Sequence, residues 1–161
     1  MEKRIINVDD LEFQPRPTAM GAAPPRYDAT IARASLLVGA EKLGYSMVKL
    51  PPGENRAYPF HNHRMNEELF IVWEGNGEVR IGDRRLPIQK GDFIACPAGD
   101  ALTAHQIVNT GDGELTYIGI STMLSPEIAD YPDSGKFGVL AEGFRFLGRA
   151  GESLGYWDGE S

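Results

Sequence analysis

Short runs rich in β-branched and aromatic residues recur along the middle of this chain, and glycine turns separate them. Short strands at this spacing are typical of a β-sandwich or a β-barrel. The predicted strands cover residues 45–50, 58–63, 68–74, 78–81, 85–88, 93–96, 103–108 and 115–121. Turns are predicted between them at Asn76-Gly77, Gly82-Asp83, Lys90-Gly91 and Gly111-Asp112-Gly113. The sequence therefore predicts an all-β fold.

The two ends of the chain differ from this middle part. Residues 1–30 contain four prolines, which break any helix, and are predicted to form an irregular N-terminal arm. Residues 31–161 are expected to form a single domain that includes a C-terminal tail, with a further strand at 144–147. Helix is expected only as one turn around residues 126–129.

Length and charge limit the class of protein. At 161 residues and 17.7 kDa the chain can bury a core as one domain. Its formal charge of -7 argues against nucleic acid or an anionic membrane as the main partner. The charged N-terminus leads into only a short apolar run, so no secretory signal is predicted. The single cysteine, Cys96, cannot form an internal disulfide, which fits a cytoplasmic location, and is expected to be a small buried residue.

All three histidines lie within one 45-residue stretch. His61 and His63 are two residues apart, and alternate side chains of a strand point to the same face. Glu68 opens the next predicted strand and can face back toward both rings, and His105 follows a glycine-led strand. Three or four nitrogen and oxygen ligands on rigid strands suit Zn, Fe, Mn, Ni or Cu. The sequence therefore predicts a metal site.

The stretch from His61 to Gly75 resembles the first motif of the cupin superfamily, and residues 91–109 resemble the second. This resemblance implies a double-stranded β-helix, a cupin or jelly-roll barrel, in which three histidines and one glutamate hold a metal. It implies one divalent transition metal ion, Zn, Fe, Mn or Ni. By position the ligands are His61, His63, Glu68 and His105. Glu68 is favoured over Glu67 because six residues then separate it from Gly75.

The resemblance has two departures. Seven residues separate Gly53 from His61, where the family usually has five, which is a loop-length change, and the other departure lies beside the third histidine. Five residues, Asp100 to Ala104, separate Gly99 from His105, where the family usually has two. This insertion adds a bulge at the barrel mouth and leaves open whether His105 stays in the ligand set. The chain as a whole resembles a group of bacterial single-domain cupins, some of which are labelled sugar-phosphate isomerases. Proteins of this kind commonly pair, and the arm offers a segment to exchange, so a homodimer is expected.

Such a site favours a metal-dependent enzyme acting on a small polar molecule with carbonyl, hydroxyl or carboxylate oxygens, such as a sugar derivative. Isomerase-type and dioxygenase-type chemistry both stay open. Glu68 is the candidate base, and Tyr117 is either a proton donor or a core residue. The alternative function is a non-catalytic barrel that binds or senses a small molecule through the metal. No basic cluster that would hold a phosphate is visible in the sequence.

Strand parity makes further predictions about the barrel interior. Tyr58 and Arg64 have the opposite parity from the histidine pair and are expected to face away from it. Ala95, Ala104 and Gly119 are small and are expected to leave room inside the barrel.

Overall fold

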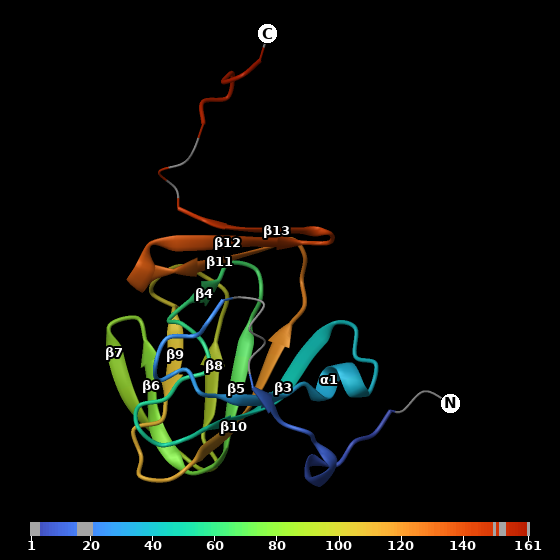
Figure 1. The fold of residues 1–161 in the computed structure, drawn as a ribbon, viewed down its shortest axis with the longest axis vertical. Helices are drawn as coiled ribbons and strands as arrows, with labels where there is room; N and C mark the ends of the chain where they lie inside the picture. The colour runs from blue at the N-terminus through green and yellow to red at the C-terminus, as the bar shows by residue number, and fades with distance from the viewer. Residues whose placement is uncertain (1–3, 16–20, 150, 152–153, 161) are drawn as a thin grey trace.

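The computed structural model describes residues 4–15, 21–149, 151 and 154–160. In this part of the chain, antiparallel strands in three sheets build a barrel with a lid-like sheet at one end (Figure 1). One wall is the six-stranded sheet β1-β2-β3-β10-β5-β8, formed by Gln14–Pro15, Thr30–Ala32, Leu43–Leu50, Leu115–Thr122, Glu68–Glu74 and Phe93–Cys96. The other wall is the sheet β7-β6-β9, formed by Arg84–Gln89, Asn76–Ile81 and His105–Val108. The predicted double-stranded β-helix is confirmed.

The third sheet lies across one end of the barrel (Figure 1). Its order is β13-β12-β11-β4, formed by Phe144–Gly148, Lys136–Ala141, Glu127–Tyr131 and Asn62–His63. The described residues 154–160 lie apart from the barrel, beyond the third sheet (Figure 1). The described part of the N-terminal arm is irregular apart from a 3-10 turn at Val8–Asp10 and the short β1, as predicted. A single short helix, α1 (Ala34–Leu37), follows β2, and no helix among the described residues is long and apolar enough to cross a membrane.

Apolar side chains from both walls fill the barrel. Leu50 and Leu115 are register partners on β3 and β10, and both are 0% exposed. On β5, Phe70 and Val72 are buried while Trp73 is exposed, because alternate residues of a strand face opposite sides. Each fully buried side chain of this size contributes about 1.5–3 kcal/mol through removal of apolar area from water. This packing holds β3, β5 and β10 rigid, and β5 begins at the predicted ligand Glu68.

The corner between β5 and β6, where the chain crosses from one wall to the other, leaves no room for side chains. Gly75 has a φ of +85°, which favours glycine. A Cβ on Gly77 would lie 2.5 Å from the carbonyl oxygen of Val108 and 2.9 Å from Cδ2 of Leu115. The predicted turn at this point is therefore packed directly against the chain entering β10.

Three sequence predictions are wrong in detail. Residues 126–129 are not a helical turn, because Glu127–Tyr131 forms β11 and pairs with both β4 and β12. Of the strand predicted at 58–63, only Asn62–His63 has regular strand structure. Ala95 does not face the interior, because Ile94 and Cys96 take the buried parity on β8. Besides β11, the sequence did not predict β1 and β2, which belong to the first sheet, or β12, which belongs to the third.

Candidate metal centre

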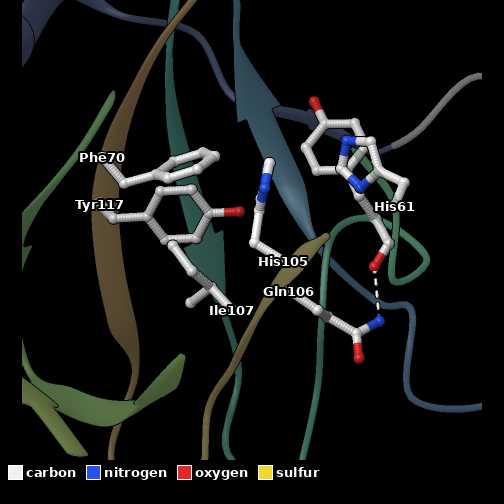
Figure 2. A pocket seen from close by; sticks show the side chains of 7 residues that line it. His61, Phe70, His105, Gln106, Ile107 and Tyr117 are labelled. Atoms are coloured by element: carbon white, nitrogen blue, oxygen red, sulfur yellow. Dashed lines mark hydrogen bonds between the residues drawn. The ribbon is translucent and has the colours of Figure 1, made fainter. Parts of the chain in front are cut away.

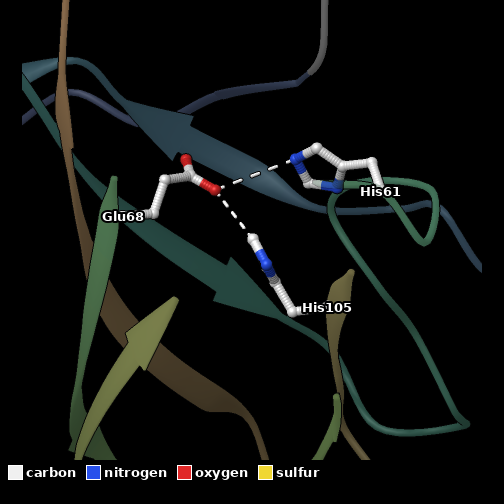
Figure 3. A group of neighbouring side chains, drawn as sticks. All are labelled: His61, Glu68 and His105. Carbon is white, nitrogen blue, oxygen red and sulfur yellow. Dashed lines mark hydrogen bonds and ion pairs between the residues drawn. The ribbon is translucent and has the colours of Figure 1, made fainter. Parts of the chain in front are cut away.

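The four predicted ligands come together near the end of the barrel that the third sheet covers. Nε2 of His61, His63 and His105 lie 3.8, 3.5 and 2.8 Å from Oε2 of Glu68. Figure 3 shows His61, Glu68 and His105 pointing toward one another, and their ligand atoms all lie within 4.8 Å of one another. The insertion before His105 has not moved its side chain away from the other three.

Backbone pairing explains how distant segments bring these side chains to one place. The amide of His105 donates to the carbonyl oxygen of His61 at 2.8 Å, and the amide of His61 donates back at 3.3 Å. Glu68 begins β5 and is held in register by β8 on one side and β10 on the other. The inserted residues close a turn of their own, in which the amide of Thr103 donates to the carbonyl oxygen of Asp100 at 3.0 Å. Because this turn absorbs the extra length, β9 begins with His105 facing inward.

Two of the rings are oriented by backbone carbonyl groups. Nδ1 of His61 lies 2.8 Å from the carbonyl oxygen of Pro59, and Nδ1 of His105 lies 3.1 Å from that of Thr103. A carbonyl oxygen only accepts hydrogen bonds, so each Nδ1 carries a proton and donates. Nε2 of each ring is thereby turned toward Glu68, which is the arrangement that a metal-binding imidazole needs.

Burial and neighbouring charges shift the pKa of His61, Glu68 and His105. Burial, together with the charge of His105, lowers the pKa of His61 to about 4. Burial also lowers the pKa of His105, but hydrogen bonds with Cys96 and Glu68 outweigh it and raise that pKa to about 10. Burial raises the pKa of Glu68, but the hydrogen bond from His105 and the charge of His63 give a net lowering. His105 and Glu68 therefore form a buried ion pair at neutral pH.

The donor set fits a divalent transition metal. Three imidazole nitrogens and one carboxylate oxygen are the ligands that Zn, Fe, Mn and Ni take in proteins. For bonds of about 2.1 Å, neighbouring ligand atoms are about 3.0–3.4 Å apart. The separations from Oε2 of Glu68, 2.8 to 3.8 Å, bracket this range. The group whose ligand atoms all lie within 4.8 Å of one another contains His61, Glu68 and His105, and His63 lies outside it. With four protein ligands, a six-coordinate ion would keep two positions for water or substrate.

An aromatic cavity of about 10 Å³, room for about one water molecule, lies beside His61 and His105 (Figure 2). Tyr117 is 2% exposed, and its ring packs edge-on against Phe70 with centroids 5.7 Å apart. Its hydroxyl points into the cavity on the side of His105 (Figure 2). Tyr58 also lines this cavity, with its ring centroid 6.2 Å from that of His61. The parity prediction for Tyr58 is wrong, because the chain there is not a regular strand and Pro59 interrupts the alternation.

A wider groove of about 600 Å³ opens outside the ligand set, between the inserted turn and the third sheet. The ring of Tyr131, which lines the groove, lies nearly parallel to that of His61 at 6.1 Å between centroids. Arg64 also lines it, facing away from the histidine pair as predicted, and donates to both carboxylate oxygens of Asp130 at 2.8 and 3.0 Å. Sequence patterns missed this groove because one of its walls is β11, which was predicted as helix.

Comparisons with known proteins agree with this fold. Residues 46–121 match the family model described as Cupin domain. Over 80 residues, half of this chain, it is 28% identical to an oxalate-binding protein of Thermotoga maritima, and the match spans 62% of that protein. A sugar phosphate isomerase from a cupin superfamily, of Silicibacter pomeroyi, is similar with a TM-score of 0.78 and 24% identity, over 96% of this chain and 98% of that one.

A further solved structure, a candidate sugar phosphate isomerase of Acidithiobacillus ferrooxidans, has a TM-score of 0.83 at 22% identity and covers 95% of this chain and 96% of its own. At such identities these structures share the fold with this chain, and fold alone does not carry function. The match of residues 46–121 to the cupin model, the barrel and the two histidine motifs together support a small protein of the cupin superfamily.

Proposed function

We propose that this cupin holds one divalent transition metal ion through His61, His63, Glu68 and His105 and acts on a small, oxygen-rich molecule. The observation that supports this is the approach of three imidazole Nε2 atoms to within 3.8 Å of one carboxylate oxygen. Such an ion, when bound, polarises carbonyl and hydroxyl oxygens and stabilises the negative charge that develops on them.

Glu68 and Tyr117 are the proposed catalytic residues. Glu68 is the candidate base, because a carboxylate has two oxygen atoms and the one that does not bind the ion can accept a proton from the substrate. Tyr117 presents its hydroxyl to the inner cavity, where it can donate to an oxygen of the substrate (Figure 2). The aromatic lining of that cavity, Phe70 and Tyr58 included, limits water beside the reacting atoms.

The substrate class follows from the groups around the site. We favour a sugar derivative or a similar molecule that binds through carbonyl, hydroxyl or carboxylate oxygens, with isomerase-type or dioxygenase-type chemistry. The cations that line the outer groove are Arg64 and Lys136, and the guanidinium of Arg64 is held by Asp130. A phosphate group usually needs several convergent cations or backbone amides, so a phosphorylated substrate is the less favoured choice.

Elemental analysis tests the ligand set. Wild type is expected to carry about one transition metal ion per chain, and His63→Ala and His105→Ala are each expected to lose it. Retention of metal by His105→Ala would reduce the site to two histidines and one carboxylate. A wild-type protein that takes up no Fe, Mn, Ni or Zn on incubation would overturn the proposal.

A second candidate function is binding without turnover. The relative named an oxalate-binding protein favours it, because oxalate is a small ligand that could bind a metal through two oxygens. Calorimetric titration of the metal-loaded protein with oxalate, followed by product analysis, separates the two functions. Saturable binding with oxalate recovered unchanged supports the binding protein, whereas turnover of any small hydroxy-carbonyl or dicarboxylate compound supports the enzyme.

We also propose that residues 31–161 form one domain and 1–30 an arm. Pairing of β11 with β4 supports this, because Asn62 and His63 join the C-terminal sheet directly to the histidine motif. Limited proteolysis is expected to remove residues from the arm first and leave the barrel with its C-terminal hairpin intact.

The chain is further proposed to form a homodimer. The β12–β13 hairpin exposes apolar side chains, and the tail after it exposes Tyr156 at 86% and Trp157 at 75%. Phe144, Phe146 and Leu147 on β13 are exposed by 57, 39 and 52%. Apolar surface gathered in one region of a protein marks an interaction site, and a second copy can cover the hairpin of the first with its own tail.

A further inference from the structure

The Nδ1 atoms of all three histidines face an oxygen atom, but the oxygen beside His63 belongs to a different kind of group. His61 and His105 face backbone carbonyls at 2.8 and 3.1 Å. Nδ1 of His63 instead lies 3.7 Å from Oε2 of Glu127 on β11. No sequence motif pointed to Glu127, which is 64 residues away from His63 along the chain.

Glu127 is a buried acidic residue whose contacts are all hydrogen-bond donors. It is 5% exposed. Its Oε1 accepts from the backbone amides of Arg64 at 3.0 Å, Met65 at 3.2 Å and Ile128 at 2.8 Å. Its Oε2 accepts from the backbone amide of Asn66 at 2.7 Å and from the side-chain amide of Asn66. Five donors converge on one side chain, which suits an acceptor-only carboxylate.

The ring of His63, which Glu127 faces, lacks the hydrogen bonds that the carboxylate has. Nδ1 of His63 is buried and makes no hydrogen bond among the described residues. A buried ring nitrogen without a partner is costly, and the group that faces it here carries a negative charge. An acceptor in this position favours a proton on Nδ1, which leaves the lone pair of Nε2 on the side of Glu68.

We propose that Glu127 is a positioning residue of the metal centre, which holds His63 in the Nδ1–H form and directs its Nε2 to the ion. This rests on the proposed metal site. The same carboxylate ties down the backbone of residues 64–66, the segment that connects His63 to Glu68. Glu127 thereby fixes the orientation of the His63 ring and also the spacing between His63 and Glu68. A charged acceptor behind an imidazole also strengthens the imidazole as a ligand, which a carbonyl does less.

A purely structural role makes a different prediction. If Glu127 only held the backbone of residues 64–66 in place, its replacement would lower the stability of the metal-free protein. The protonation of the His63 ring nitrogens would then not change. Asp130 provides the matched control. It lies on the same strand, pairs with Arg64 and accepts from the side-chain amide of Asn62 at 3.0 Å, so it also supports the neighbours of His63. In the β11–β4 register its partner is Asn62, not a histidine.

The test measures zinc affinity by competition with a chromophoric chelator for wild type, Glu127→Gln and Asp130→Asn. Glu127→Gln is expected to weaken zinc binding about 10–100-fold, while Asp130→Asn stays within about 3-fold of wild type. Adding Glu127→Gln to His63→Ala is expected to cause a much smaller loss than in wild type, because the part of the effect that acts through the His63 ring is then absent. Unchanged affinity in Glu127→Gln, or an equal loss in the His63→Ala background, would overturn the proposal.

A measurement on the wild-type protein keeps the proposal testable if Glu127→Gln fails to fold. A long-range ¹H–¹⁵N spectrum of the metal-free protein reports which ring nitrogen of each histidine carries the proton before an ion imposes the tautomer. His63 is expected to be protonated at Nδ1, and protonation at Nε2 would refute the role of Glu127. A wild-type protein that binds no zinc in the competition assay would overturn the metal site itself and this inference with it. Zinc binding with the wrong His63 tautomer would overturn the inference alone.

Discussion

His105 donates a hydrogen bond from Nε2 to Oε2 of Glu68 over 2.8 Å, while its Nδ1 faces the carbonyl oxygen of Thr103 at 3.1 Å. Both ring nitrogens act as donors, so His105 is an imidazolium in the metal-free protein, in agreement with its raised pKa of about 10. A metal ion bound to Nε2 of His105 must displace that proton. The metal-free site is therefore held together by a proton on His105.

Metal binding should release about one proton per site near neutral pH. His105 supplies this proton, whereas His61, whose pKa is lowered to about 4, is already neutral. The dissociation constant for zinc should then fall about tenfold per pH unit between pH 6.5 and 8.5. Calorimetry in buffers with different ionisation enthalpies counts the protons directly. A binding enthalpy that does not depend on the buffer would contradict the assignment.

The same ion pair should make the metal-free protein less stable at high pH. The pKa of His105 is about 10 in the folded chain against an ordinary histidine value of 6.5. Its stabilising contribution is therefore complete below about pH 6.5 and is lost as the pH rises through about 10. Thermal unfolding of the metal-free protein between pH 7 and 10.5 should show a falling Tm, and Glu68→Gln should show a flatter profile. Parallel profiles would mean that the His105–Glu68 pair is not responsible.

Bound metal should stabilise the folded chain by mass action. At a free zinc concentration about 1,000 times the dissociation constant, the gain is about 4 kcal/mol. Chelation should therefore lower the Tm of wild type by several degrees. The matched control is His105→Ala, whose Tm should respond little to either zinc or chelator because the ligand set is incomplete. An equal response of the two proteins would indicate that zinc binds elsewhere.

The parts of this structure that sequence patterns predicted depend on local alternation. His61 and His63, two residues apart, do share a side, and the burial of Phe70 and Val72 follows from the position of Glu68 on β5. Alternation failed for Tyr58, because Pro59 interrupts the strand that the argument assumed. Local patterns suffice wherever a strand is regular and one of its faces is buried.

The remaining parts depend on pairing between distant segments. Residues 127–131 form a strand because β4 and β12 lie on either side of them, and nothing in their own sequence requires it. Glu127 reaches His63 only through that pairing, so no sequence motif could predict its position beside Nδ1 of His63. Likewise, the distance between Gly99 and His105 along the chain did not reveal that the inserted residues close their own turn.

The β5–β6 corner should tolerate no added methyl group. Gly77→Ala places a Cβ 2.5 Å from the carbonyl oxygen of Val108, and this backbone atom cannot move without disturbing β9. Overpacking of this kind costs about 1–3 kcal/mol. Gly113→Ala is the control, because a Cβ there meets no atom within 4 Å. Denaturant unfolding should show a large loss of stability for Gly77→Ala and almost none for Gly113→Ala, and similar losses would contradict the tight corner.

The proposed homodimer predicts a solution mass of twice the 17.7 kDa chain mass. Phe146→Lys should shift the equilibrium toward monomer, because it places a charge on the exposed β12–β13 hairpin, where Phe146 packs against Phe137 at 5.6 Å between centroids. Phe93→Lys is the matched control, since Phe93 is also an exposed aromatic residue, at 71%, but lies on β8 in the six-stranded wall and not in the third sheet. Sedimentation velocity across micromolar concentrations distinguishes the outcomes. A monomeric wild type excludes the dimer. Dissociation by Phe93→Lys alone would indicate that the interface lies at the edge of β8 and not at the hairpin.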